Sequence, residues 1–226
     1  MKKLSIIIIS VLLIISFATA TMGGSVYIDH SIWGQWEYKD NEGKGDGELI
    51  LSTVGLEADI NNFIIGLEGH LKTLVFEDDW FDEKYEVDYT GYQLKAGWRV
   101  VNGEKFDAAL IVLGYYRERD QNSDQNSKYN LNGILLGTDL TFYLSDLISL
   151  EGSLGISVDA ALKSEESGET FKNDAELIFL RLKYNYLYTE NFGIYLSIKS
   201  FFEKYDDEFN SSFLSSGLAV GFNYRF

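Results

Sequence analysis

Apolar side chains recur at every second position in ten segments of this chain, from about residue 24 to its last residue. A period of two is the pattern of a strand, because successive side chains of a strand point to opposite faces of the sheet. Residues 148 to 162 show it most clearly, with apolar side chains alternating with serine, glycine and acidic ones. Each segment therefore predicts a strand with one apolar face and one mostly small or polar face.

The connections between these segments alternate in length. Short ones fall at residues 61–62, 101–105, 145–147 and 189–191, and longer polar ones at 39–47, 77–84, 118–127, 163–173 and 203–212. All five long connections lie at the same end, as in membrane barrels with short periplasmic turns and longer external loops. The pattern predicts an all-β fold: a closed antiparallel up-and-down transmembrane β-barrel of ten strands, with eight strands as the alternative.

In such a barrel the apolar face of each strand points toward lipid. The outward set includes Trp36 and Tyr38 in the first segment and Leu162 in the seventh. The fifth segment is ambiguous, because the face from Ala109 to Tyr115 is nearly as apolar as the face with Leu110, and its register could slip by one residue. We assign Leu110 to the outer face.

The first twenty residues have the parts of a Sec-type signal peptide. Lys2 and Lys3 precede an apolar run at 4–17, and Ala18-Thr19-Ala20 forms a small-residue cleavage site. The run is shorter than the roughly 18 residues that a membrane-spanning helix needs. We expect cleavage after Ala20, which leaves residues 21–226 as the barrel domain. Because the whole chain carries a net charge of −16, and cleavage removes two lysines, a nucleic-acid binder is excluded.

The composition excludes further classes of protein and of site. The chain has no Cys and no Pro, which excludes a disulfide scaffold and a thiolate metal site and suits a sheet without edges. Its 15 Phe, 15 Tyr and 4 Trp suit aromatic girdles at the membrane interfaces. Glycine-rich 43–47 is not followed by a helical pattern, so it is no phosphate-binding motif. We expect no cofactor and no metal.

The last segment alternates Leu218, Val220, Phe222, Tyr224 and Phe226 up to the final residue. This ending resembles that of the small bacterial outer-membrane β-barrel proteins, the porin-like class, with no subfamily indicated. The resemblance implies the bacterial outer membrane, with lipid and lipopolysaccharide as surroundings. It also implies that Phe222, Tyr224 and Phe226 are the signal read by the barrel-assembly machinery.

The interior of a small barrel is filled by side chains, so inward charges should pair. If Asn102-Gly103 pairs Val100 with Phe106, Arg99 lies opposite Asp107. The turn around Glu190 likewise places Arg181 opposite Lys199, two like charges that need an inward acid. The predicted lumen charge network is therefore Glu57, Glu68, His70, Lys95, Arg99, Asp107, Asp139, Glu151, Asp159, Arg181 and Lys199. We favour a structural network over a selectivity-setting channel lining.

Two histidines are candidates for a chemical role. His70 shares an inward face with Glu68 and should lie opposite Thr53, an arrangement that a hydrolase would use for base and nucleophile. Its place in the middle of a strand in a narrow lumen argues against catalysis, and we expect no enzyme. His30 falls on the outer face, which predicts a bulge near Asp29 or a register error, and we assign it no function.

The external loops concentrate acid: Asp78, Asp79, Asp82 and Glu83 in the second, Asp206 and Asp207 in the last. Such oxygen ligands suit Ca²⁺ or Mg²⁺, but no ligand spacing is present, so we favour solvated loops. Trp80 and Phe81 in the second loop would suit contact with a membrane surface or a partner.

These observations favour a narrow porin-like channel for small ions or solutes, with a preference for cations if acidic groups control its mouth. The alternative is a surface-exposed structural or adhesive barrel that acts through its external loops. A hydrolase built on His70 is the third reading.

Overall fold

The computed structural model describes residues 23–41, 43–78, 83–120, 128–166, 169–207 and 210–226. The predicted signal peptide lies outside them. The strands are β1 (Gly23–Lys39), β2 (Lys44–Ile60), β3 (Phe63–Asp78), β4 (Glu83–Asn102), β5 (Phe106–Asp120), β6 (Lys128–Ser145), β7 (Ile148–Glu166), β8 (Glu169–Leu187), β9 (Phe192–Tyr205) and β10 (Ser212–Arg225). No helix in these ranges is long and apolar enough to cross a membrane.

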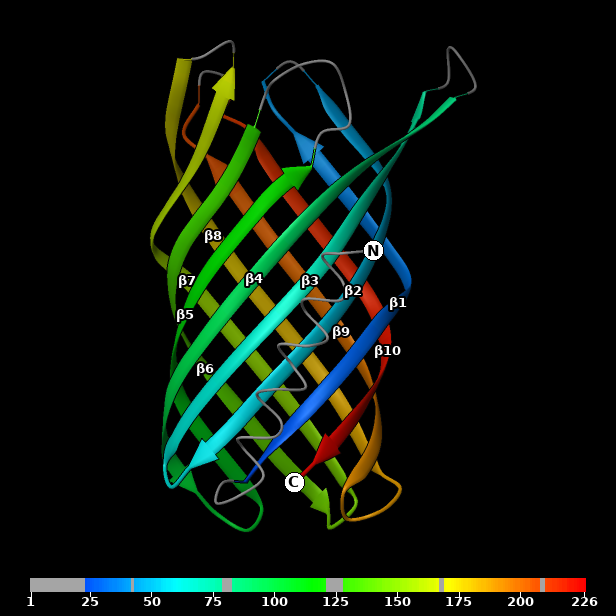
Figure 1. The fold of residues 1–226 in the computed structure, drawn as a ribbon, viewed down its shortest axis with the longest axis vertical. Helices are drawn as coiled ribbons and strands as arrows, with labels where there is room; N and C mark the ends of the chain where they lie inside the picture. Colours follow the sequence, from blue (N-terminus) through cyan, green and yellow to red (C-terminus); the bar gives the residue numbers. More distant parts are fainter. Residues whose placement is uncertain (1–22, 42, 79–82, 121–127, 167–168, 208–209) are drawn as a thin grey trace.

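Every strand pairs with its neighbours in sequence, and β1 pairs with β10 to close the barrel (Figure 1). All the pairings are antiparallel. The closing seam ends where the amide of Gly24 donates to the carbonyl of Phe226 (3.2 Å) and the amide of Phe226 donates back (3.1 Å). The prediction of a closed barrel with ten strands is confirmed.

The two ends of the barrel differ. Four short connections and the seam between Gly24 and Phe226 lie at one end, the short-turn end, and the five other connections lie at the opposite, long-hairpin end (Figure 1). The Asn61-Asn62 turn joins Ile60 directly to its partner Phe63, with Asn61 in the left-handed region at φ 58°, which asparagine tolerates.

The strands run further into the long connections than the sequence predicts. β1 continues to Lys39 and β2 begins at Lys44, so this connection is far shorter than residues 39–47. β7 and β8 likewise continue to Glu166 and from Glu169. Polar segments can extend an antiparallel ladder because its backbone hydrogen bonds do not depend on apolar side chains. About half of the predicted loop sequence therefore belongs to strands.

The outer face is apolar over the middle of the barrel. Large exposed side chains cover it, Leu94 and Leu110 among them at 62% and 57%. Toward the short-turn end aromatic rings pair across neighbouring strands, as in Phe63 with Trp98, whose ring centroids lie 4.4 Å apart. Such a band with an aromatic border is the surface of a transmembrane barrel.

A β-bulge in β1 corrects the predicted face of two aromatic residues. Ser31 pairs with Ala219 and Trp33 with Leu218, so Ile32 is an extra residue in the ladder. A bulge of one residue exchanges inward and outward positions beyond it. Trp33 is therefore exposed on the outer face, while Trp36, predicted outward, is buried inside at 3% exposure.

Tyr38 follows Trp36 and packs against the interior cluster that Trp36 forms, so its predicted outward position is wrong for the same reason. A second irregularity lies in β7, where Ile134 pairs with Asp159 but Leu135 pairs with Ser157. Asp159 is exposed outside the barrel, and Leu162 packs against the interior cluster. The predictions that Asp159 points inward and Leu162 outward are therefore wrong, because the extra residue between those pairs exchanges the two faces of β7 beyond it.

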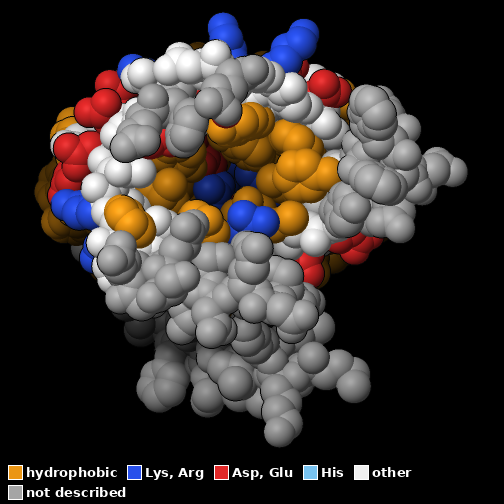
Figure 2. Space-filling view, turned by 90° about the horizontal axis from the view of Figure 1, so that it is seen from above, with side chains coloured by type: hydrophobic (Ala, Val, Ile, Leu, Met, Phe, Trp, Pro, Cys, Tyr) orange, Lys and Arg blue, Asp and Glu red, His pale blue; other side chains and the backbone are white. Residues whose placement is uncertain are grey.

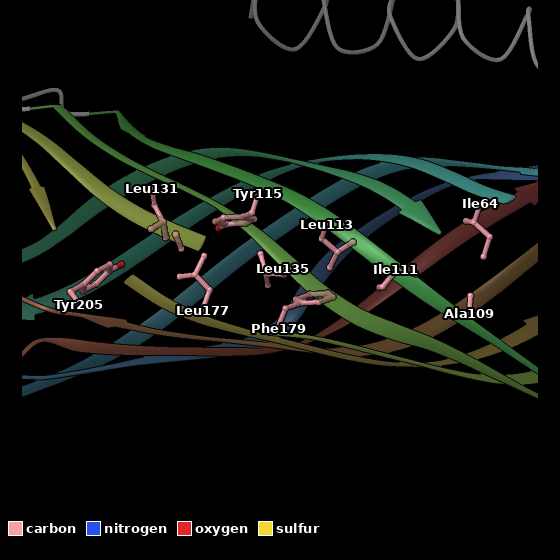
Figure 3. Close-up of a cluster of buried hydrophobic side chains, with 11 residues drawn as sticks. Ile64, Ala109, Ile111, Leu113, Tyr115, Leu131, Leu135, Leu177, Phe179 and Tyr205 are labelled. Atoms are coloured by element: carbon pink, nitrogen blue, oxygen red, sulfur yellow. The ribbon is translucent and has the colours of Figure 1, made fainter. Parts of the chain in front are cut away.

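In β5 the assigned register is right. Leu110 is exposed outside, while Ile111, Leu113 and Tyr115 are buried inside the barrel. They belong to a cluster with residues of β3 and β6 to β9, several of which Figure 3 shows pointing toward one another. The interior is therefore apolar along one side, contrary to the mostly polar lumen that the sequence predicted.

Candidate functional site

Glu68 of β3 lies at the centre of the charged side of the interior. It is 8% exposed and accepts a hydrogen bond from the Tyr27 hydroxyl at 2.7 Å. The Arg181 guanidinium approaches the same carboxylate at 3.3 Å, and the Lys199 ammonium lies 4.0 Å from its other oxygen. Because β3 and β8 are five strands apart in a ring of ten, the Glu68–Arg181 pair bridges the full width of the lumen.

Arg181 and Lys199 are directly opposite each other on β8 and β9, as the sequence predicted. Lys199 is also held by Asp29 of β1 at 2.9 Å, and it donates to the Thr53 hydroxyl at 2.7 Å. Two like charges are thus accommodated by two acids, Glu68 and Asp29. Asp29 was not among the predicted network residues.

Lys95 of β4 joins two predicted acids. Its ammonium contacts Glu57 of β2 and lies 2.9 Å from Asp139 of β6. β2 and β6 each lie two strands away from β4, on opposite sides of it. Lys95 can contact both acids because all three side chains point into the barrel at the same level. The structure thus brings three residues of the predicted network into contact.

The predicted pairing of Arg99 with Asp107 needs a correction. Asp107 pairs with Asn102 and Arg99 with Ala109, because an irregularity between Arg99 and Val101 shifts the ladder. The two side chains still approach to 3.9 Å, but the shorter contact of Arg99 is with Asp59 at 2.8 Å.

A cavity of about 280 Å³ opens at the short-turn end. Glu151 borders it and is held by Lys183 at 3.4 Å and by the Asn185 side-chain amide at 2.7 Å. Arg99 and Asp107 lie on its wall as well. Acids and bases alternate around this cavity, so its charges are largely neutralised within the wall.

Further toward the long-hairpin end, Arg117 of β5 and Glu203 of β9 form a second bridge across the lumen. Glu203 is fully buried and takes two hydrogen bonds from the Arg117 guanidinium, one of them at 2.7 Å. The Tyr205 hydroxyl donates to the same carboxylate. A fork-to-fork contact of this kind is the strongest geometry for an arginine and a carboxylate.

An aromatic row lies between the two bridges. The His70 ring stacks on Tyr115 at 5.7 Å, Tyr115 stacks on Phe201 at 4.7 Å, and Phe201 contacts Phe179 at 6.3 Å. The row runs from β3 through β5 to β9 and β8, which lie around opposite sides of the ring. Rings and ion pairs together occupy this level of the interior beside a cavity of about 60 Å³.

His70 does lie opposite Thr53, as predicted. However, the Thr53 hydroxyl accepts a hydrogen bond from Lys199, and the His70 ring stacks on Tyr115. The described contacts include none between the His70 ring and a hydroxyl. His70 packs in the aromatic row, and the hydroxyl opposite it is engaged by Lys199.

His30 is exposed on the outer face, as its register predicted, and the bulge lies two residues after it rather than near Asp29. Its Nδ1 atom lies 2.7 Å from the Ser52 hydroxyl of β2. This bond satisfies a polar ring beside lipid, where an unpaired polar group is costly.

The predicted acidic loop cluster is only partly described. Asp79 and Asp82 lie outside the described residues, and Asp78 and Glu83 pair at the end of the β3–β4 ladder. The Asp207 carboxylate accepts a bond from the Ser211 amide at 2.9 Å, and the Asp206 amide donates to the carbonyl of Asp174. No group of three acids or histidines in the described part of the chain would hold a metal ion.

Several interior charges escaped the sequence prediction. They share an inward position on a strand and an ion-pair partner, and they are Asp29, Asp59, Arg117, Lys183 and Glu203. Alternation alone would have placed each of them inward. Arg117 and Glu203 were missed because they stand at the edge of segments taken as external loops.

The last residues of the chain help to close the barrel wall. Phe222 and Tyr224 are half exposed on the outer face at 50% and 49%, while the backbone of Phe226 pairs with Gly24. Recognition of these residues by the barrel-assembly machinery stays a prediction.

No protein-family model matches the chain, and no curated protein matches its sequence. Among solved structures, Ail, the attachment invasion locus protein of Yersinia pestis, is 13% identical, with 91% of this chain and 99% of that chain covered and a TM-score of 0.44. The translocator domain of the autotransporter NalP from Neisseria meningitidis is 12% identical, with 95% and 92% covered and a TM-score of 0.44. Neisserial surface protein A is 14% identical, with 90% and 97% covered and a TM-score of 0.34. These are proteins to which the chain is similar, and the barrel fold itself is established by the strand pairing of this chain.

Proposed function

We propose that this protein is a sealed barrel of the bacterial outer membrane that acts at the cell surface through its long-hairpin end. The observation that carries the proposal is the filled cross-section. Glu68–Arg181 and Arg117–Glu203 bridge opposite walls, and the row from His70 to Phe179 packs between them.

The cavities inside the described wall support the same reading. One of about 280 Å³ opens at the short-turn end, and two further along the interior measure about 20 and 60 Å³. A space of 20 Å³ holds about one water molecule, too little for a hydrated ion. A conducting path would require buried, fully paired ion pairs to separate, which is energetically costly.

The hairpins at the opposite end suit a surface role. Their strands continue beyond the apolar band with outward polar side chains such as Glu37, Glu48 and Lys172. Paired hairpins present side chains at fixed positions, as recognition surfaces require. With the short turns in the periplasm, this end faces the outside, and lipopolysaccharide surrounds it.

The narrow channel is the second candidate, and the charged cavity at the short-turn end is the observation that favours it. Planar-bilayer conductance of the refolded mature protein separates the two. A sealed barrel gives no current steps, whereas a channel gives discrete ones. Biogenesis fits either: Phe222, Tyr224 and Phe226 would direct the chain to the barrel-assembly machinery after export.

A further inference from the structure

One rung of inward side chains near the long-hairpin end alternates cations and tyrosines. Lys72 of β3 lies opposite Tyr89 of β4, Tyr89 opposite Arg119 of β5, and Arg119 opposite Tyr129 of β6. Neighbouring strands are about 4.8 Å apart, so the backbones of Lys72 and Arg119 stand roughly 10 Å apart along the wall. We call these four residues the mouth row.

The mouth row lies at the level where the outer face changes character. Its outward neighbours include Asp88 of β4 and Glu118 of β5, whereas six residues further along each strand the outer face carries Leu94 and Val112. Acidic side chains on the outside mark the end of the lipid-facing band. The row is therefore within reach of the aqueous side.

Lys72 is buried without a carboxylate. Its side chain is 6% exposed, and its ammonium donates to the Ser215 hydroxyl at 3.1 Å and lies 4.5 Å from the centre of the Phe213 ring. Within the described residues no acid forms an ion pair with it. Buried ammonium groups are ordinarily paired with an anion, because desolvation of the charge is costly.

Arg119 shows the same deficit. Its guanidinium lies 5.4 Å from the centre of the Tyr129 ring, and its Nε atom is buried with no hydrogen-bond partner. The described carboxylates give it no ion pair either. Arg117 lies one inward position lower and has Glu203, which it shares with Tyr205. Lys72 and Arg117 thus share one nearby carboxylate, which is already bound by Arg117 and Tyr205.

The space around these cations is apolar. Viewed from the long-hairpin end, the barrel mouth is a hollow lined by hydrophobic side chains, with Lys and Arg side chains at its bottom (Figure 2). Trp36 stacks with Phe213 at 5.9 Å and contacts Phe76 at 4.3 Å on the wall. A cavity of about 60 Å³ borders Lys72, with Leu49, Tyr115 and Phe201 among its other walls.

We infer that this mouth is a binding site for a small amphiphilic carboxylate, with the anionic group between Lys72 and Arg119 and an aromatic or alkyl body against the surrounding rings. The inference deepens the proposed function, since it gives the surface end of a sealed barrel a ligand class. A carboxylate supplies the missing counter-charge. Its body replaces water over Phe213 and Tyr89, where a strongly hydrated polyanion gains nothing.

The test uses the mature protein refolded in detergent micelles and benzoate as the probe, with saturation-transfer NMR as the readout. Two further probes divide the site: benzamide keeps the ring without the charge, and acetate keeps the charge without the ring. We expect saturable binding of benzoate, with benzamide and acetate each weaker by at least about tenfold, the effect of losing one good polar or apolar contact.

The variants are Lys72→Met and Arg119→Met, which keep most of the side-chain volume and remove the charge. Each should weaken benzoate binding by about tenfold. Lys204→Met is the matched control, because Lys204 is a half-exposed lysine of β9 that pairs with Glu176 on the outer face. It should bind benzoate as the unmodified protein does. Heat-modifiable gel migration verifies that each variant is folded.

Three results would overturn the inference: no saturable benzoate binding to folded protein, benzamide binding as tightly as benzoate, or unchanged affinity in both Lys72→Met and Arg119→Met. A sulfated sugar that binds where benzoate does not would likewise replace it with a polyanion site. None of these outcomes depends on conductance, so the sealed barrel and its ligand fail or survive separately.

Discussion

Glu68 and Arg181 stand on opposite walls of the barrel, yet their side chains meet at 3.3 Å in the middle of the lumen. The contact has two consequences. It closes the passage at this level, and it ties strands β3 and β8, which share no ladder, into one cross-braced wall.

Removing the acid from the first bridge should destabilise the barrel strongly. Glu68→Gln leaves Arg181 and Lys199 facing each other with one acid fewer, and breaking a buried pair costs about 3–5 kcal/mol. Urea unfolding in lipid vesicles, followed by tryptophan fluorescence, measures the change in unfolding free energy. Glu176→Gln is the matched control, because its pair with Lys204 is exposed and such pairs contribute at most about 1 kcal/mol. Equal losses in the two variants would contradict the account.

The second bridge should behave as a coupled pair. Arg117→Met and Glu203→Met should each cost about 3–5 kcal/mol, because each leaves one buried charge alone. The double variant should cost less than the sum of the two, because it removes both charges together. A double-mutant cycle from urea unfolding gives the coupling energy. Simple additivity would mean that the two groups do not interact inside the folded barrel.

Glycines beneath inward rings should resist enlargement. A Cβ atom on Gly221 of β10 would overlap the ring of Tyr195, its neighbour on β9. Gly221→Ala should therefore cost about 1–3 kcal/mol, the range for overpacking. At Gly43 a Cβ would meet nothing within 4 Å, so Gly43→Ala is the control and should change stability little. A neutral Gly221→Ala would show that Tyr195 does not lie over this strand.

The bulge at Ile32 predicts opposite environments for two nearby tryptophans. Variants that keep only Trp33 or only Trp36, with the other tryptophans replaced by Phe, can be refolded into vesicles of brominated lipid. Trp33 fluorescence should be quenched strongly, because this side chain is 55% exposed on the outer face, and Trp36 fluorescence should be quenched little. Strong quenching of Trp36 instead would restore the unbroken alternation that the sequence suggests.

The sequence predicted the barrel because alternation and connection length are local properties. It also predicted the pairs that a tight turn determines, such as Thr53 with His70 and Arg181 with Lys199. It misplaced Trp36 and Asp159 because a single extra residue reverses every later side chain, and no local signal marks Ile32 or the irregularity in β7.

The cross-lumen contacts were out of reach for another reason. Arg117 and Glu203 are 86 residues apart and meet only because closure and stagger bring β5 and β9 to the same level. Inward alternation identifies candidates for such contacts but not their partners. The apolar side of the lumen has a trace in the sequence, because both faces of β5 are apolar. From the sequence alone, this pattern left only the orientation of β5 ambiguous.

The most direct test of the sealed lumen is the conductance of the refolded mature protein in a planar bilayer under a salt gradient. Heat-modifiable migration of the same sample establishes that the inserted protein is folded. We expect no discrete current steps, because the bridges from Glu68 and Glu203 and the aromatic row between them block the lumen. Regular steps with a defined reversal potential would contradict it and assign the protein as a channel.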